Sequence, residues 1–193
     1  MAIEILRGVP LDPARPVLTL GDGPPDDTYA LVEDGVMRWQ AAVGWGDHRH
    51  VPFREELIWP SIDAVVIGGG DHVHVLDRAT GAVRARIAVP SLFGGLALDP
   101  GEPPHRPEAL FIAGWRDLIA LEPTLAIRWH ATDLAIDGVI VHDVVGTVVR
   151  IGCEMDPPGG WFDVEVDALT GRELGRRPAF TEDYVGPLRR PPA

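Results

Sequence analysis

The sequence predicts an all-β domain, and two observations support this. Short runs of alternating apolar and polar residues recur along the chain, and polar turns separate them. Of the 193 residues, 46% are hydrophobic and 24% are charged, as in ordinary globular proteins. The 22 glycines and 19 prolines supply the many turns that short strands need. We therefore expect a single β domain over residues 1–188, followed by a short disordered tail at residues 189–193.

A repeat of about 45 residues organises these runs. The turn glycines Gly35 and Gly81 are 46 residues apart, and Gly171 follows 90 residues later, which is two periods. The pair Arg38-Trp39 recurs as Arg128-Trp129. Each copy reads as a strand, a polar turn and a second strand, which together predict a hairpin. The four hairpins are Thr28–Val43, His72–Val89, Asp117–Thr132 and Trp161–Arg176.

A further apolar strand precedes each hairpin, and other strand patterns lie between the copies. The preceding strands are Val17–Gly21, Ala64–Gly70, Ala109–Gly114 and Thr147–Gly152. Candidate fourth strands are Gly95–Pro100 and Gly138–Asp143. Four strands in a unit of roughly 40 to 45 residues is the spacing of propeller blades. We therefore predict about four propeller-like blades of four short antiparallel strands, in a closed ring or in an open half-ring that dimerises. A β-sandwich of the same hairpins is the alternative.

One segment resembles the repeat of quinoprotein-like β-propellers, the family of PQQ-type and WD40-like repeats. In Val73–Arg84 an aliphatic strand ends in Leu-Asp and a Thr-Gly turn follows. Val164–Leu174 keeps the Asp and the Thr-Gly, whereas Leu118–Trp129 keeps the tryptophan of the return strand and loses the glycine. The resemblance spans nearly the whole chain and implies a propeller, but such blades serve redox enzymes, scaffolds and sensors alike. Nothing here supplies the quinone site of the larger members, so no cofactor is expected.

Missing residue types exclude several chemistries. The chain has no lysine, which rules out Schiff-base and phosphate-loop lysine chemistry. Its two serines, Ser61 and Ser91, lie outside a G-x-S-x-G elbow, so a serine hydrolase is not expected and no catalytic residue is assigned. The lone Cys153 lies in an apolar stretch and is predicted to be a buried thiol.

The net charge of −12 bears on partners. Such a charge repels phosphate backbones, so no nucleic-acid partner is expected, whereas a basic protein would be attracted. No apolar run approaches the length of a membrane span, and residues 1–8 resemble no signal peptide, so we expect a cytoplasmic protein without a membrane partner.

Two Asp-His-x-His strings, at residues 47–50 and 71–74, suggest a metal site. Residues i and i+2 of a strand share a face, so on neighbouring strands the strings would bring imidazoles together around Zn²⁺ or Fe²⁺. The first string also resembles the first motif of the cupins, which makes a cupin-like fold a further alternative. Alternation on a solvated strand face is the other interpretation. The candidate metal-binding residues are His48, His50, His72, His74 and Glu55.

The six tryptophans fall into two groups. Trp39 and Trp129 occupy equivalent repeat positions, which predicts a role in blade packing. The others are not periodic, and an exposed loop tryptophan is a common binding anchor. The binding-surface candidates are Trp45, Trp59, Trp115 and Trp161.

These observations favour a non-enzymatic interaction module. The specific hypothesis is a protein that scaffolds or neutralises a basic protein partner, as an immunity protein does, with a homodimer as one assembly. The alternatives are a metal-dependent enzyme that uses the histidine strings and a β protein that binds a sugar or another small ligand.

Overall fold

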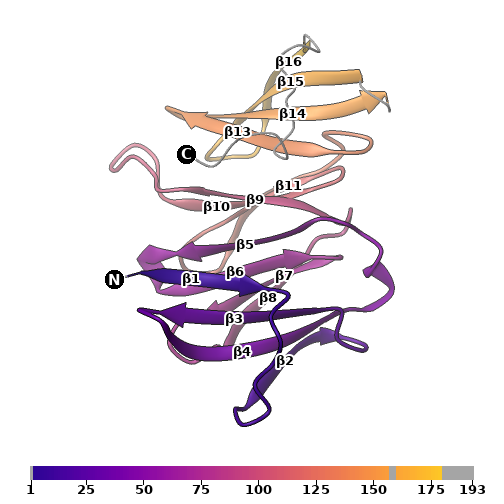
Figure 1. Cartoon of the computed structure of the whole chain (residues 1–193). Helices are drawn as coiled ribbons and strands as arrows, with labels where there is room; N and C mark the ends of the chain where they lie inside the picture. Colours follow the sequence, from indigo (N-terminus) through magenta and orange to yellow (C-terminus); the bar gives the residue numbers. More distant parts are fainter. Residues whose placement is uncertain (1, 157–159, 180–193) are drawn as a thin grey trace. The chain divides into compact units, whose positions relative to one another are not determined.

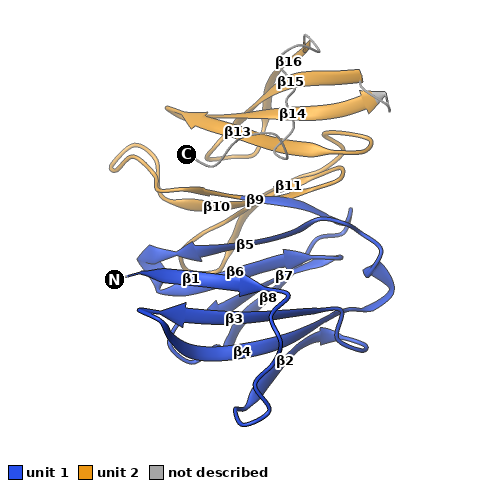
Figure 2. Cartoon of the chain, viewed as in Figure 1, with its two compact units in different colours: residues 1–96 blue, residues 97–193 orange. Residues whose placement is uncertain are grey.

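The computed structural model describes residues 2–156 and 160–179, and it confirms the all-β prediction. These residues form sixteen strands in four four-stranded sheets (Figure 1). None of their helices is long and apolar enough to cross a membrane. The chain divides into two compact units, residues 1–96 and 97–193 (Figure 2). The tail predicted at residues 189–193 lies outside the described residues.

Unit 1 contains two of the sheets. The second has its strands in chain order: β5 (Arg54–Trp59), β6 (Ala64–Gly69), β7 (His72–Asp77) and β8 (Val83–Ala88). The first has the order β1 (Ile3–Arg7), β3 (Asp27–Glu33), β4 (Val36–Trp45) and β2 (Val17–Asp22). Here β2 pairs in parallel with β4, so this sheet departs from the purely antiparallel blade that the sequence predicts.

The loop between β1 and β2 accounts for this departure. It runs over residues 8–16 and contains three prolines, which cannot donate to a sheet ladder. Gln40 of β4 holds the loop, because its side chain accepts a hydrogen bond from the Asp12 N–H at 2.7 Å and donates to the Asp12 and Arg15 carbonyls. The chain therefore crosses the first sheet before β2 joins its outer edge.

Unit 2 contains the other two sheets, again with their strands in chain order. One comprises β9 (Phe93–Asp99), β10 (Ala109–Gly114), β11 (Leu118–Leu121) and β12 (Ile127–Ala131). The other comprises β13 (Val139–Val145), β14 (Val148–Asp156), β15 (Gly160–Asp167) and β16 (Glu173–Pro178). Strand β9 includes the boundary between the units, at residues 96 and 97.

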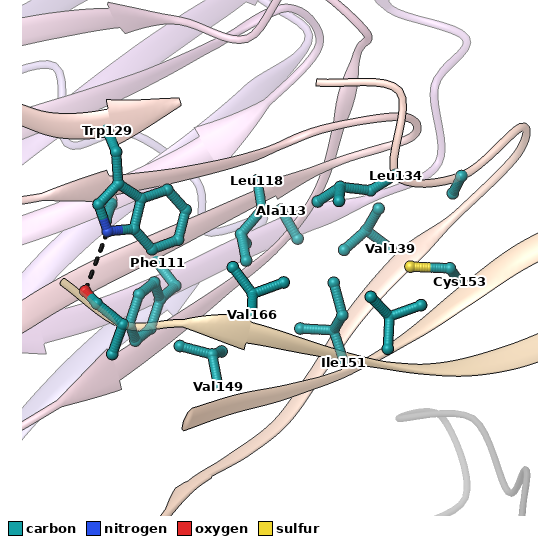
Figure 3. Close-up of a cluster of buried hydrophobic side chains, with 14 of the residues drawn as sticks. Phe111, Ala113, Leu118, Trp129, Leu134, Val139, Val149, Ile151, Cys153 and Val166 are labelled. Carbon is teal, nitrogen blue, oxygen red and sulfur yellow. Dashed lines mark hydrogen bonds between the residues drawn. The ribbon is translucent and has the colours of Figure 1, made fainter. Parts of the chain in front are cut away.

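Each unit has a core between its own two sheets. In unit 1 the side chains of Leu31, Trp39 and Val43 from the first sheet pack with Ile67 and Leu76 from the second. In unit 2 the core combines side chains of both sheets (Figure 3), and it includes Phe111, Leu118, Trp129, Val149, Ile151, Cys153 and Val166. The prediction of a buried thiol is confirmed, and burial raises the pKa of Cys153 to about 12.

A tryptophan joins the two sheets inside each unit. The Trp39 indole N–H donates to the Arg78 carbonyl at 2.9 Å, and the Trp129 indole N–H donates to the Ala168 carbonyl at 2.9 Å (Figure 3). Each accepting carbonyl belongs to a turn of the next sheet along the chain. The predicted packing role of these two tryptophans is therefore confirmed.

The accepting turns share one design. The Asp77 carboxylate accepts hydrogen bonds from the amide and the hydroxyl of Thr80, and Asp167 does the same with Thr170. A glycine with φ of +73° follows each threonine. In the third repeat Leu125 occupies the glycine position with φ of 66°, a conformation that a residue with a Cβ rarely adopts.

Candidate functional site

The two Asp-His-x-His strings differ in conformation. His72 and His74 lie on one face of β7, as predicted, with ring centroids 4.6 Å apart. His48 instead ends the 3-10 helix η1 (Gly46–His48), and His50 lies in the turn that follows. The strand predicted for the first string is therefore wrong, because β4 ends at Trp45 and Gly46 has φ of +58°.

The two β7 histidines are buried, each only 2% exposed. Burial lowers the pKa of both, that of His74 to about 3, so the rings are neutral near pH 7. His72 Nδ1 lies 2.6 Å from a carboxylate oxygen of Asp71. Within the described residues, His72 Nε2 and both His74 nitrogens have no hydrogen-bond partner. The Trp45 ring packs on both, at centroid distances of 5.2 and 6.3 Å.

The other predicted ligands do not complete a metal site. His48 Nε2 lies 3.7 Å from Asp71 Oδ2. The Glu55 carboxylate accepts a hydrogen bond from the Leu96 amide, and burial raises its pKa. No group of three or more His, Cys, Asp or Glu side chains in the described part of the chain is arranged to hold a metal ion. The Zn²⁺ or Fe²⁺ hypothesis stays a prediction without support from this geometry.

Two of the tryptophan candidates are core residues. Trp45 is 1% exposed and Trp59 is 0% exposed, so the expectation that they lie on a binding surface is wrong. The Trp45 indole N–H donates to Asp27 at 2.6 Å, and the Arg54 guanidinium lies 4.7 Å above the ring. The preceding glycine allows close packing, because a Cβ on Gly44 would lie 2.5 Å from a backbone oxygen.

The other two tryptophan candidates are half-buried. Trp115 follows β10, and Trp161 lies near the start of β15. Their proposed part in a binding surface stays a prediction.

The last sheet carries a groove that the sequence did not predict, and we call it the outer groove. Its volume is about 300 Å³. It opens on the face that carries Arg150 and Glu165, whereas the neighbouring residues Ile151 and Val164 belong to the core of unit 2. The residues that line it are His142, Asp143, Arg150, Ile151, Asp163, Val164, Glu165 and Arg177.

The charges of the outer groove are mostly paired. Arg150 donates two hydrogen bonds to Asp143, which raise the pKa of this arginine. Arg177 Nε lies 3.1 Å from Asp163. Glu165 is exposed and forms no ion pair with any described residue closer than 4.0 Å. The groove therefore carries one more negative charge than positive charge.

The alternation of acidic and apolar residues in β15 is a sequence signal for this groove. Asp163 and Glu165 are two residues apart and share a face, and strand register places Glu165 opposite Arg150 and Asp163 opposite Arg177. These cross-strand pairs are visible only when the register of neighbouring strands is known, and the pattern of a single strand does not give that register.

The comparisons with known proteins support the architecture. No family model matches the sequence, and no curated protein matches it. Among solved structures, the chain resembles BamB from Moraxella catarrhalis, a β-propeller, with a TM-score of 0.52 and 18% sequence identity. The fold is propeller-like. The match covers 78% of this chain and 46% of BamB, so the chain spans less than half of that protein. At this identity the likeness shows the fold and not membership of the quinoprotein-like family.

Proposed function

We propose that the chain is a protein-interaction module that binds a basic protein partner through its acidic surface. One observation carries this proposal. Every described arginine except Arg49 and Arg172 has a carboxylate oxygen within 4.0 Å, so little positive charge is left for other molecules. Exposed carboxylates outside such ion pairs remain on both units: Glu4, Asp26, Asp34, Asp47, Glu102, Asp137 and Glu165.

This charge distribution attracts a cationic partner and repels an anionic one. Unpaired surface carboxylates steer a basic protein toward the chain and raise its association rate. The propeller-like fold by itself serves many functions, so the charge and not the architecture supports the choice of partner.

The specific form of this proposal is neutralisation, as by an immunity protein in the cytoplasm. A bound partner would then lose its activity. Co-expression of the chain with its captured partner tests this. The partner expressed alone should inhibit host growth, and growth should recover in proportion to the amount of complex formed. Growth inhibition that persists with the complex fully formed would leave scaffolding as the role.

Affinity capture from the native host is the test of the partner class. We expect a protein rich in Lys and Arg that is retained at 0.1 M salt and released near 0.5 M, because the screening length falls from about 10 Å at 0.1 M salt to about 3 Å at 1 M. A variant with Asp26→Asn, Asp47→Asn, Glu102→Gln and Asp137→Asn should retain less of it. The control with Arg49→Gln and Arg172→Gln should retain as much or more. An acidic partner, or equal retention by all three proteins, would contradict the proposal.

A further inference from the structure

We propose that the outer groove binds a lysine or arginine side chain of the basic partner, and this inference rests on the proposed function. The groove is a cavity with a defined lining on a sheet face that no described residue covers with a second sheet. Charge, shape and the position of Glu165 each support a cationic side chain as its occupant.

Glu165 gives the outer groove its excess negative charge. The two arginines of the groove already have carboxylate partners in Asp143 and Asp163, so neither is free to bind an anion. Glu165 forms no ion pair within 4.0 Å with any described residue, although its negative charge lies opposite Arg150 and helps to raise the pKa of that arginine. An incoming ammonium or guanidinium group would pair with Glu165 and lie beside Asp163, which shares its face of β15. An anionic ligand would meet three carboxylates instead.

Gly175 leaves space for a side chain next to Glu165. It lies opposite Glu165 in strand register, and a second hollow of about 230 Å³ next to it shares Asp163, Glu165 and Arg177 with the outer groove. A Cβ built on Gly175 would have no atom within 4 Å. The missing side chain therefore leaves space beside the unpaired carboxylate, and a larger residue would occupy that space without a clash.

Peptide binding tests this assignment. The probe is a fluorescein-labelled arginine–glycine peptide, and its anisotropy is measured with the full chain at low salt. We expect Glu165→Gln to weaken binding by about fivefold or more because it removes the charge that would pair with the peptide, which corresponds to about 1 kcal/mol. We expect Gly175→Phe to weaken binding by about fivefold or more because the ring would occupy the space beside Glu165. The matched controls are Asp133→Asn, an exposed carboxylate of the same unit outside the groove, and Ala88→Phe, an added ring at an exposed position of β8. Both should leave the affinity nearly unchanged. Circular dichroism and Tm confirm that each variant is folded.

Three outcomes would overturn the assignment. Equal weakening by Asp133→Asn and Glu165→Gln would show that the whole acidic surface binds the peptide. Tighter binding, by about tenfold, in a chain with Arg189→Ala and Arg190→Ala would show that the chain's own basic residues occupy the groove. A dimer in sedimentation that Glu165→Gln dissociates would assign the groove to a second copy.

The proposed function and the groove can fail separately. If the native partner is still captured by the Glu165→Gln and Gly175→Phe variants at wild-type levels, the groove assignment is wrong and the interaction module stands. If no basic partner is captured by the wild-type chain, the proposed function is wrong whatever the peptide does.

Discussion

His74 lies in the core of unit 1 with two ring nitrogens that no described residue bonds. A buried polar group without a partner costs about 1–3 kcal/mol, and an apolar side chain of similar size avoids that cost. We predict that His74→Leu raises the free energy of unfolding by about 1 kcal/mol in urea denaturation. The surface substitution His50→Leu is the control and should change it little. Destabilisation by His74→Leu would show that the ring has a partner, such as a metal ion or a water molecule.

Metal content separates these cases directly. Mass spectrometry of chain purified without chelator should give less than one metal ion per several molecules, because the described residues form no three-ligand group. A near-stoichiometric metal that disappears from a folded variant with His48, His50, His72 and His74 replaced by alanine would revive the enzyme hypothesis.

Asp77 should contribute to the pH dependence of stability. Hydrogen bonds from Arg84 and Thr80 lower its pKa from 3.8 to about 2. Because the pKa is lower in the folded chain than in the unfolded chain, the stabilisation is complete above about pH 4 and disappears as the pH falls toward 2. We predict that Asp77→Asn lowers Tm at pH 7 and that the difference from wild type shrinks between pH 4 and pH 2. Asp137→Asn is the exposed control. A difference that is constant with pH would contradict this account.

At the level of elements, a tryptophan of one sheet packs closely on a turn glycine of the next sheet in each unit. A Cβ on Gly171 would lie 2.7 Å from the Trp129 ring, whereas a Cβ on Gly35 would meet nothing within 4 Å. Both glycines have a positive φ, of +73° and +78°. Gly35→Ala should therefore cost only the backbone strain of about 1–2 kcal/mol. Gly171→Ala should cost clearly more, because it also displaces the ring. Equal losses in thermal or urea unfolding would show that the ring contact contributes nothing.

At the scale of the whole molecule, we predict that the chain is a monomer in solution. Gly175 occupies the repeat position that Trp39 and Trp129 occupy in two of the other copies. The last sheet therefore has no tryptophan at this position that could pack on a turn of a second chain. Hydrogen bonds between the Gln40 side chain and the Asp12 backbone hold the loop of residues 8–16 on the first sheet. Light scattering after size exclusion should give the mass of one chain, 20.9 kDa. A stable dimer would favour the open half-ring that the sequence left as an alternative.

The sequence by itself determined the class of fold and its repeat. The turn glycines and the Asp-x-x-Thr-Gly turns are local signals, because each depends on the backbone conformation of a few neighbouring residues. The two Arg-Trp pairs are a signal of the repeat, because the same short motif occurs in two copies. Together these signals predicted four hairpin units, and the structure has one in each sheet. They also predicted that Trp39 and Trp129 pack between sheets, because the two tryptophans occupy equivalent positions in two copies of the repeat.

Contacts between strands and between sheets determine which residues share a site. The burial of Trp45 and Trp59 and the parallel pairing of β2 depend on what lies across the sheet or on the neighbouring sheet, and the end of β4 at Trp45 places His48 in a 3-10 helix. The outer groove depends on the register that places Gly175 opposite Glu165. Strand periodicity gives the face on which a side chain lies, but it does not give the strand next to it or the surface that covers it. For that physical reason the sequence predicted the blades of this protein and missed its groove.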